Sequence, residues 1–197
     1  MNREERIEDN RLYHVYNRGN DRDRIFGDVS DYDSFIRKMK SLAVSFLIDV
    51  PIYTLMPNHY HMIALQQTGG DLSKMMGALA TSAAKRYNLK YRHIDHLFQG
   101  PFRYKLVREQ NLWYVASYIH MNPVRARLVE RPQAWKFSNY AKDFLPAGAS
   151  RREGNLLRGI WDGYAGYVAG VLEDGSANET WEKKIKAHVR EFVDELC

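Results

Sequence analysis

The chain has 197 residues, of which 45% are hydrophobic, so it can bury a core as one domain with an appendage or as two small domains. No apolar run approaches the length of a membrane span, and residues 1–20 are charged rather than typical of a signal peptide, so we expect a cytoplasmic protein. The formal net charge is +5, and the single cysteine, Cys197, excludes an internal disulfide.

The positive charge is concentrated in one part of the chain. Residues 74–131 contain eleven Lys and Arg against three Asp and Glu, whereas residues 151–197 contain seven basic and nine acidic residues. A basic segment beside a mildly acidic tail favours one surface that faces a polyanion. Charge alone favours nucleic acid only weakly, because many soluble proteins carry a modest positive excess.

The first predicted elements are a strand and a helix. Residues 12–17 are rich in β-forming side chains, and the Arg-Gly-Asn-Asp sequence at 18–21 predicts a turn after them. Asp31 or Ser30 can cap the helix that follows. The apolar residues of this helix recur at helical spacing and are Phe35, Ile36, Met39, Leu42 and Ala43.

A hairpin is predicted next. Residues 47–55 and 59–65 have the composition of strands, and Met56-Pro57-Asn58 is a connection short enough for a hairpin. Because proline cannot donate to a sheet ladder, Pro51 indicates that the first of these strands starts late or lies at an edge.

Helix and strand then alternate. A helix over 72–87 has Asp71 as its cap and a stripe of Leu72, Met75, Met76, Leu79 and Ala83. Residues 102–108 alternate apolar and basic side chains, as a half-exposed strand does. Helical spacing returns at 111–122, and Pro123 is expected to break or kink that helix.

The order of these elements predicts the fold class. Strand, helix, strand, strand, helix, strand, helix indicates an α+β fold, in which an antiparallel sheet has helices on one face, as in ferredoxin-like and RNA-recognition domains. Residues 146–150 form a candidate linker, so we expect one domain over 1–145 and a helical C-terminal extension over 146–197. Within the extension, residues 180–196 carry the clearest helical stripe.

Two histidines two residues apart are the first candidate site. On a strand, His59 and His61 project from the same face and could supply two ligands of a metal site. An isolated His-x-His pair is more often just two polar residues at the start of a strand.

A tyrosine and an asparagine one helical turn apart are the second candidate. Tyr118 and Asn122 share a helix face, where an amide oxygen could complete a metal site and a phenol could attack a phosphate. Without the histidines, Asn122 is better interpreted as a helix-ending residue and Tyr118 as a half-buried aromatic. Tyr114 lies one turn before Tyr118 and is interpreted as a packing or base-stacking residue.

Together these motifs resemble a known family. Met-Pro-Asn-His-Tyr-His at 56–61, followed by Ser-Tyr-Ile-His-Met-Asn-Pro-Val-Arg-Ala at 117–126, resembles the REP-associated tyrosine transposases of the single-tyrosine HUH superfamily. The segments at 13–20 and 100–107 resemble two further strands of that family, and the likeness covers about 11–140. The middle position of the His-x-His motif departs mildly from the family, because Tyr60 is bulky rather than aliphatic. We expect it to pack on the opposite sheet face.

The resemblance implies an activity. His59 and His61 would be the HUH histidines, Asn122 the third ligand of Mg²⁺ or Mn²⁺, and Tyr118 the nucleophile. The implied reaction is cleavage and strand transfer of single-stranded hairpin or repeat DNA through a covalent 5′-phosphotyrosine. It also implies a bacterial protein, associated with the nucleoid when bound to DNA, that works as a monomer or as a helix-exchanged homodimer.

Basic side chains near these motifs are candidate DNA contacts, because Arg and Lys pair with phosphates while aromatic rings stack on unpaired bases. The candidates are Arg18, Asn20, Arg103, Lys105, Arg125 and Arg127. Three further histidines, His14, His93 and His96, are interpreted as loop or surface residues rather than ligands.

Two alternatives compete with the transposase interpretation. One is a protein derived from a transposase, or an RNA-recognition-like domain, that binds single-stranded DNA or RNA without cleaving it. Such a binder has no use for a tyrosine and an asparagine facing two histidines. The other is a phosphoesterase with two His-x-Thr/Ser motifs, which this chain lacks.

Overall fold

A computed structural model describes residues 6–143 together with Tyr164 and Val168. The chain divides into two compact units, Met1–Arg108 and Glu109–Cys197, and each is described by itself. The expected linker at 146–150 and the expected helix at 180–196 lie outside the described residues. They stay predictions, as does the expected boundary between residues 145 and 146.

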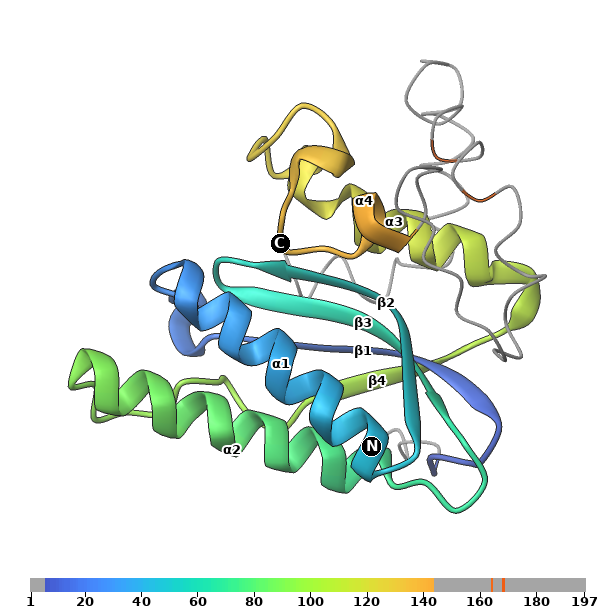
Figure 1. The fold of residues 1–197 in the computed structure, drawn as a ribbon, viewed down its shortest axis with the longest axis horizontal. Coiled ribbons are helices and arrows are strands. Elements are labelled where there is room, and N and C mark those ends of the chain that lie inside the picture. The colour runs from blue at the N-terminus through green and yellow to red at the C-terminus, as the bar shows by residue number, and fades with distance from the viewer. Residues whose placement is uncertain (1–5, 144–163, 165–167, 169–197) are drawn as a thin grey trace. The chain divides into compact units, whose positions relative to one another are not determined.

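The first unit is built on a four-stranded antiparallel sheet in the order β2-β3-β1-β4 (Figure 1). Its strands are β1 (Arg11–Arg18), β2 (Ile48–Met56), β3 (His59–Gln66) and β4 (Arg103–Val107). β1 and β3 are the interior strands, and each pairs with a neighbour on both sides. The predicted strands and the predicted α+β class are therefore confirmed.

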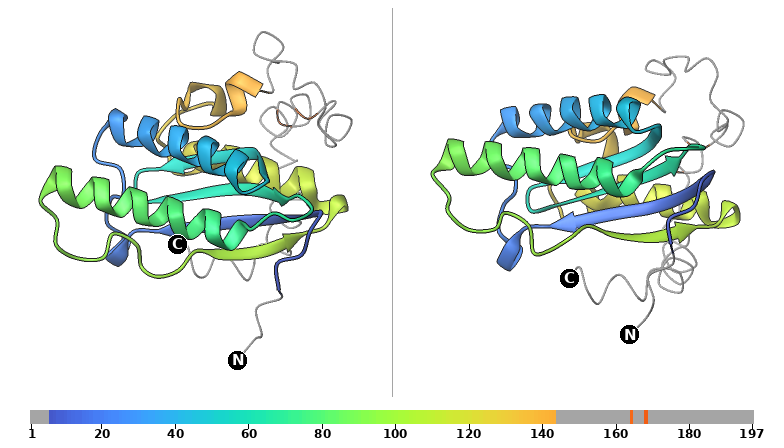
Figure 2. Two further views of the ribbon diagram at one scale, coloured as in Figure 1. Left: turned by 60° about the horizontal axis from the view of Figure 1, so that its bottom comes forward. Right: turned by 90° about the horizontal axis from the view of Figure 1, so that it is seen from below.

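Helices α1 (Val29–Ser45) and α2 (Leu72–Tyr91) lie side by side on one face of this sheet (Figures 1 and 2). Tyr60 of β3 points to this face, where its ring lies 5.2 Å from that of Phe35 on α1. Because side chains alternate along a strand, the neighbouring His59 and His61 point to the opposite face. The expected place of Tyr60 is confirmed.

The start of α1 differs from the prediction. Asp28, not Asp31 or Ser30, is the N-cap, and its side chain accepts a hydrogen bond from the Ser30 amide. Asp31 occupies the third helical position, and its carboxylate accepts from the backbone of Gly27 and Asp28. The two acids form a reciprocal capping box, so the helix starts earlier than either predicted cap would allow.

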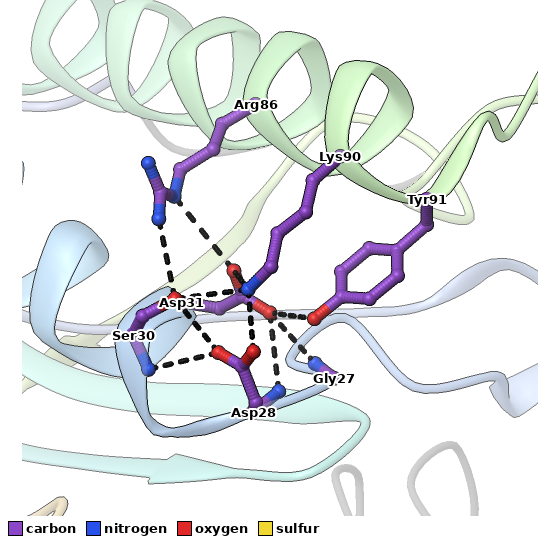
Figure 3. Close-up of polar contacts among 7 residues, drawn as sticks. All are labelled: Gly27, Asp28, Ser30, Asp31, Arg86, Lys90 and Tyr91. Atoms are coloured by element: carbon purple, nitrogen blue, oxygen red, sulfur yellow. Dashed lines mark hydrogen bonds and ion pairs between the residues drawn. The ribbon is translucent and has the colours of Figure 1, made fainter.

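The same carboxylates tie α1 to the end of α2 (Figure 3). Lys90 Nζ lies 2.7 Å from Asp28 Oδ2 and 2.9 Å from Asp31 Oδ1, and the Tyr91 hydroxyl donates to Asp31 over 2.7 Å. Arg86 adds a longer ion pair of 3.7 Å to Asp31. We call these five side chains, Asp28, Asp31, Arg86, Lys90 and Tyr91, the helix-pair cluster.

Strand β2 is an edge strand, as Pro51 indicated. Its pairing with β3 shifts register between Asp49 and Ile52, which places the proline at an irregularity where no ladder donor is needed. At the start of α2, Asp71 accepts from the Lys74 amide, so this predicted cap is also correct.

The second unit is helical over its described part. α3 (Leu112–Arg125) runs on through Pro123 instead of ending there, and short α4 (Tyr140–Asp143) follows. Buried His120 connects α3 to two later residues of this unit. Its Nε2 lies 3.1 Å from Asn139 Oδ1, and its Nδ1 lies 3.0 Å from the Tyr164 hydroxyl. None of the helices in the described ranges has both the length and the apolar character needed to cross a bilayer.

Candidate metal and nucleophile residues

The two histidines of the His-x-His pair lie next to each other on β3, on the sheet face opposite α1 and α2. Their ring centroids are 5.1 Å apart, with the ring planes nearly perpendicular. His61 is buried and His59 is partly exposed at the end of the strand. A third imidazole, that of His14 on β1, stacks on His61 with a centroid distance of 5.1 Å.

Each of the paired histidines uses its Nδ1 within the protein. Nδ1 of His59 lies 2.7 Å from Oδ1 of Asn58, and Nδ1 of His61 lies 3.0 Å from Nε2 of His14. Asn58 is itself oriented, because its amide nitrogen donates to the Arg22 carbonyl. An amide oxygen only accepts, so His59 must carry its proton on Nδ1 and its lone pair on Nε2.

Burial keeps both imidazoles neutral near pH 7. Desolvation, helped by the nearby charge of Arg18, lowers the pKa of His59 to about 4. Desolvation, together with the neighbouring imidazoles of His59 and His14, lowers the pKa of His61 well below its ordinary value. A neutral imidazole is the form that binds metals, so the protein maintains the ligand form of both side chains.

Three basic side chains lie on the same sheet face as the histidines. Arg18 is the β1 partner of His59, and its Nε donates to Gln99. On β4, Arg103 pairs with Tyr16 and Lys105 pairs with His14. Directly paired residues share a sheet face, so both cations lie on the histidine face. Asn20 is at the turn after β1, where its amide nitrogen reaches Asp21.

The second group of predicted residues lies together on α3. The side-chain nitrogen of Asn122 donates to the Tyr118 carbonyl over 2.9 Å, which fixes the amide with its oxygen as the remaining polar atom. The guanidinium of Arg125 lies over the Tyr118 ring, 5.4 Å from its centroid. Arg127 follows the helix, is exposed and has a positive φ of 55°.

Three other residues that the sequence analysis considered, Tyr114, His93 and His96, lie outside the proposed metal and nucleophile set. Tyr114, one turn before Tyr118, accepts at its carbonyl from the Ser117 hydroxyl. His93 and His96 lie in the loop after α2, as expected, and His93 Nδ1 is 3.2 Å from the Asn88 side chain.

The interpretation of His14 as a surface residue is wrong. It is buried on an interior strand and hydrogen-bonded to His61. Its Nε2 is used by His61, and the described residues contain no group of three His, Cys, Asp or Glu side chains that could hold a metal ion. His14 is two residues from Tyr16, so both side chains point to the same face of β1. They lie next to His61 because β1 pairs with β3 in this register, with Tyr16 opposite His61.

Comparisons with known proteins identify a family and a similar fold. A family model described as "Transposase IS200 like" matches residues 9–122, a range that includes the histidine pair, Tyr118 and Asn122. A solved REP-associated tyrosine transposase bound to a REP hairpin is similar in fold, with a TM-score of 0.63 and 16% identity over 75% of this chain and 88% of that one. A putative transposase from Deinococcus radiodurans R1 aligns with a TM-score of 0.43 and 16% identity over 60% of this chain and 95% of that one. No curated protein matches the chain.

Proposed function

Because the chain belongs to the IS200-like transposase family, we propose that it cuts and rejoins single-stranded DNA with Tyr118 as its nucleophile. The observation that carries the proposal is the pair of neutral imidazoles, His59 and His61, presented by one strand face with their Nδ1 atoms already engaged. The matched range also contains the Tyr118–Asn122 pair, so both halves of the proposed chemistry fall inside the family likeness.

The residues present suit a divalent metal ion. His59 and His61 would bind it through Nε2, and Asn122 would bind it through Oδ1, a nitrogen and oxygen set compatible with Mg²⁺ or Mn²⁺. Burial disfavours protonation of both imidazoles, so a proton need not leave before an ion binds. When bound, such an ion supplies positive charge that polarises a phosphate oxygen.

Tyr118 performs the covalent step in this proposal. Its phenolic oxygen forms a bond to phosphorus, and the bond from phosphorus to the 3′-oxygen breaks. The phenol releases one proton and the leaving 3′-oxygen takes one up, so the products are a 5′-phosphotyrosine and a free 3′-hydroxyl. Attack by another 3′-hydroxyl reverses the step and joins strands. Arg125 lies over the Tyr118 ring and would help to hold the phenol in place, whereas Asn122 donates to the Tyr118 carbonyl.

Stem-loop DNA is the proposed substrate. Arg18, Arg103 and Lys105 lie on the histidine face and can pair with backbone phosphates. Phe102 and Tyr104 alternate with these cations along the chain, so they point to the opposite face of the sheet and are not proposed as stacking partners for this DNA. The structurally similar REP-associated transposase is bound to a REP hairpin, which makes a hairpin the natural first substrate to test. Asn20, Arg125 and Arg127 stay candidate DNA contacts.

Capture of the covalent intermediate tests this function. Purified full-length protein is incubated with Mn²⁺ and a labelled single-stranded hairpin carrying 5′ and 3′ flanks, and is then denatured. We expect a protein–DNA adduct that survives denaturation, disappears with chelator and is absent from Tyr118→Phe.

Tyr114→Phe is the matched control, because it removes the same hydroxyl one turn earlier on the same helix. It should form the adduct at the wild-type level. Adduct formation by Tyr118→Phe would overturn the assignment of the nucleophile. Hairpin binding by the wild type without any adduct would support the non-cleaving binder instead.

A further inference from the structure

His14 and His61 form a buried pair between the two interior strands of the sheet. Tyr16 is the direct β1 partner of His61, and His14 lies diagonally across from His61, opposite Ile63. The two imidazoles are nearly parallel, with 27° between their planes, and Nε2 of His14 is 3.0 Å from Nδ1 of His61. Only 3% of His14 and 1% of His61 are exposed, so bulk water does not compete for this bond.

A hydrogen bond between two imidazole nitrogens can run in only two directions, because one nitrogen must donate and the other accept. If His14 donates, the proton of His61 lies on Nε2 and blocks metal binding there. If His61 donates from Nδ1, its lone pair lies on Nε2. The second arrangement matches His59, whose Nδ1 must donate to the Asn58 amide oxygen.

We infer that His14 is a positioning residue, which accepts the Nδ1 proton of His61 and so keeps its Nε2 available for the metal. This inference rests on the proposed function. Asn58 does the same for His59, so the two metal-binding imidazoles are oriented by separate acceptors from different segments. Such a partner fixes both the tautomer and the ring plane of a ligand, and its loss costs about 10–100-fold in metal affinity.

A simple packing role is the competing explanation, and two substitutions separate it from positioning. His14→Phe keeps a ring that can stack on His61 but removes the acceptor. His14→Gln loses the ring but can accept through its side-chain oxygen. If His14 only fills space, phenylalanine is the better replacement; if it accepts the proton, glutamine is.

The first measurement needs no metal. Long-range ¹H–¹⁵N correlation spectra of the labelled, metal-free protein report which nitrogen of each histidine carries the proton, and His61→Leu identifies the signals of residue 61. We expect His61 to be protonated on Nδ1 in the wild type and in His14→Gln. A proton on Nε2 of His61 in the wild type would overturn the inference, whether or not either variant folds.

The second measurement is Mn²⁺ affinity, followed by electron paramagnetic resonance. We expect a loss of about 10–100-fold in His14→Phe and near wild-type affinity in His14→Gln. Equal affinity in His14→Phe and the wild type would reject His14 as a positioning residue and leave the proposed function intact. If the wild type itself bound no Mn²⁺, the metal part of the proposed function would fail, while the tautomer spectra would still decide the direction of the bond.

Discussion

Two polar clusters in the first unit use their hydrogen bonds in different ways. In the helix-pair cluster, the buried Asp31 carboxylate is surrounded by donors from Lys90, Tyr91 and the backbone just before α1. In the histidine cluster of His14, His59 and His61, desolvation lowers the pKa values of His59 and His61, and one nitrogen of each of these two histidines is engaged locally. The first arrangement satisfies charges and stabilises the fold. The second leaves the Nε2 atoms of His59 and His61 for a ligand, so we expect it to contribute more to ligand binding than to the stability of the fold.

The largest expected effect comes from the histidine cluster. His61→Leu keeps most of the buried volume but removes a metal-binding nitrogen, so we expect cleavage to fall at least about a thousandfold, because several kcal/mol of charge stabilisation are lost. The free energy of unfolding should change by no more than about 2 kcal/mol, mainly from the acceptor of His14 left unsatisfied. Single-turnover cleavage and urea unfolding measure the two effects. Ile63→Leu, on the same strand face, is the control and should cleave normally.

The helix-pair cluster should give the opposite result. Asp31→Ala removes the shared partner of Lys90, Tyr91 and Arg86, so we expect the free energy of unfolding to fall by about 3 kcal/mol. The folded fraction should cleave within a few-fold of the wild type. Asp33→Ala removes an exposed carboxylate from the same helix and should leave stability nearly unchanged. A large loss of cleavage in folded Asp31→Ala would break the contrast between the clusters.

A smaller change tests one bond of the helix-pair cluster. Tyr91→Phe removes the hydroxyl that donates to Asp31 over 2.7 Å. The carboxylate keeps its other donors, so the free energy of unfolding should fall by only about 1 kcal/mol. Thermal or urea unfolding at neutral pH measures this difference. A loss as large as that of Asp31→Ala would mean that the tyrosine, not the lysine, dominates the cluster.

The mildest test is acid titration of the same cluster. Hydrogen bonds from Lys90 and Ser30 lower the pKa of Asp28 to about 2. Burial alone would raise the pKa of Asp31, but hydrogen bonds from Lys90 and Tyr91 lower it overall. Folded carboxyls with lowered pKa values stabilise the protein above about pH 4, the unfolded value, and this contribution is lost as the pH falls toward 2. Urea midpoints should therefore drop across this range, and less steeply in Asp31→Asn.

Much of the fold was predictable because its signals are local. Each of these signals predicts the structure of the residues next to it in the chain. Examples are the two-residue alternation of 59–65 and 102–108, the Asp71 cap and the proline of an edge strand. The cap of α1 was not predictable in the same way. Asp28, Ser30 and Asp31 are all good caps; in the structure Asp28 and Asp31 form a reciprocal capping box, and both pair with Lys90, 59 residues after Asp31 in the chain.

The same limit applies to the candidate site. The histidine pair is visible as a spacing of two, and the Tyr118–Asn122 pair as a spacing of four. His14 lies 47 residues before His61, and its role depends on the pairing of β1 with β3 in one particular register. A slip of one residue would turn His14 to the helix-covered face, and no local pattern in the sequence reports that register.

The strand order has a consequence for how long the histidines stay aligned. Both strands that carry them, β1 and β3, are hydrogen-bonded along each side, whereas β2 and β4 form the borders of the sheet. Local opening begins where backbone amides are least protected, so in hydrogen–deuterium exchange the borders should label first and the amides of the middle strands last. Fraying of the sheet can therefore proceed some distance inward before the geometry of the imidazoles is lost.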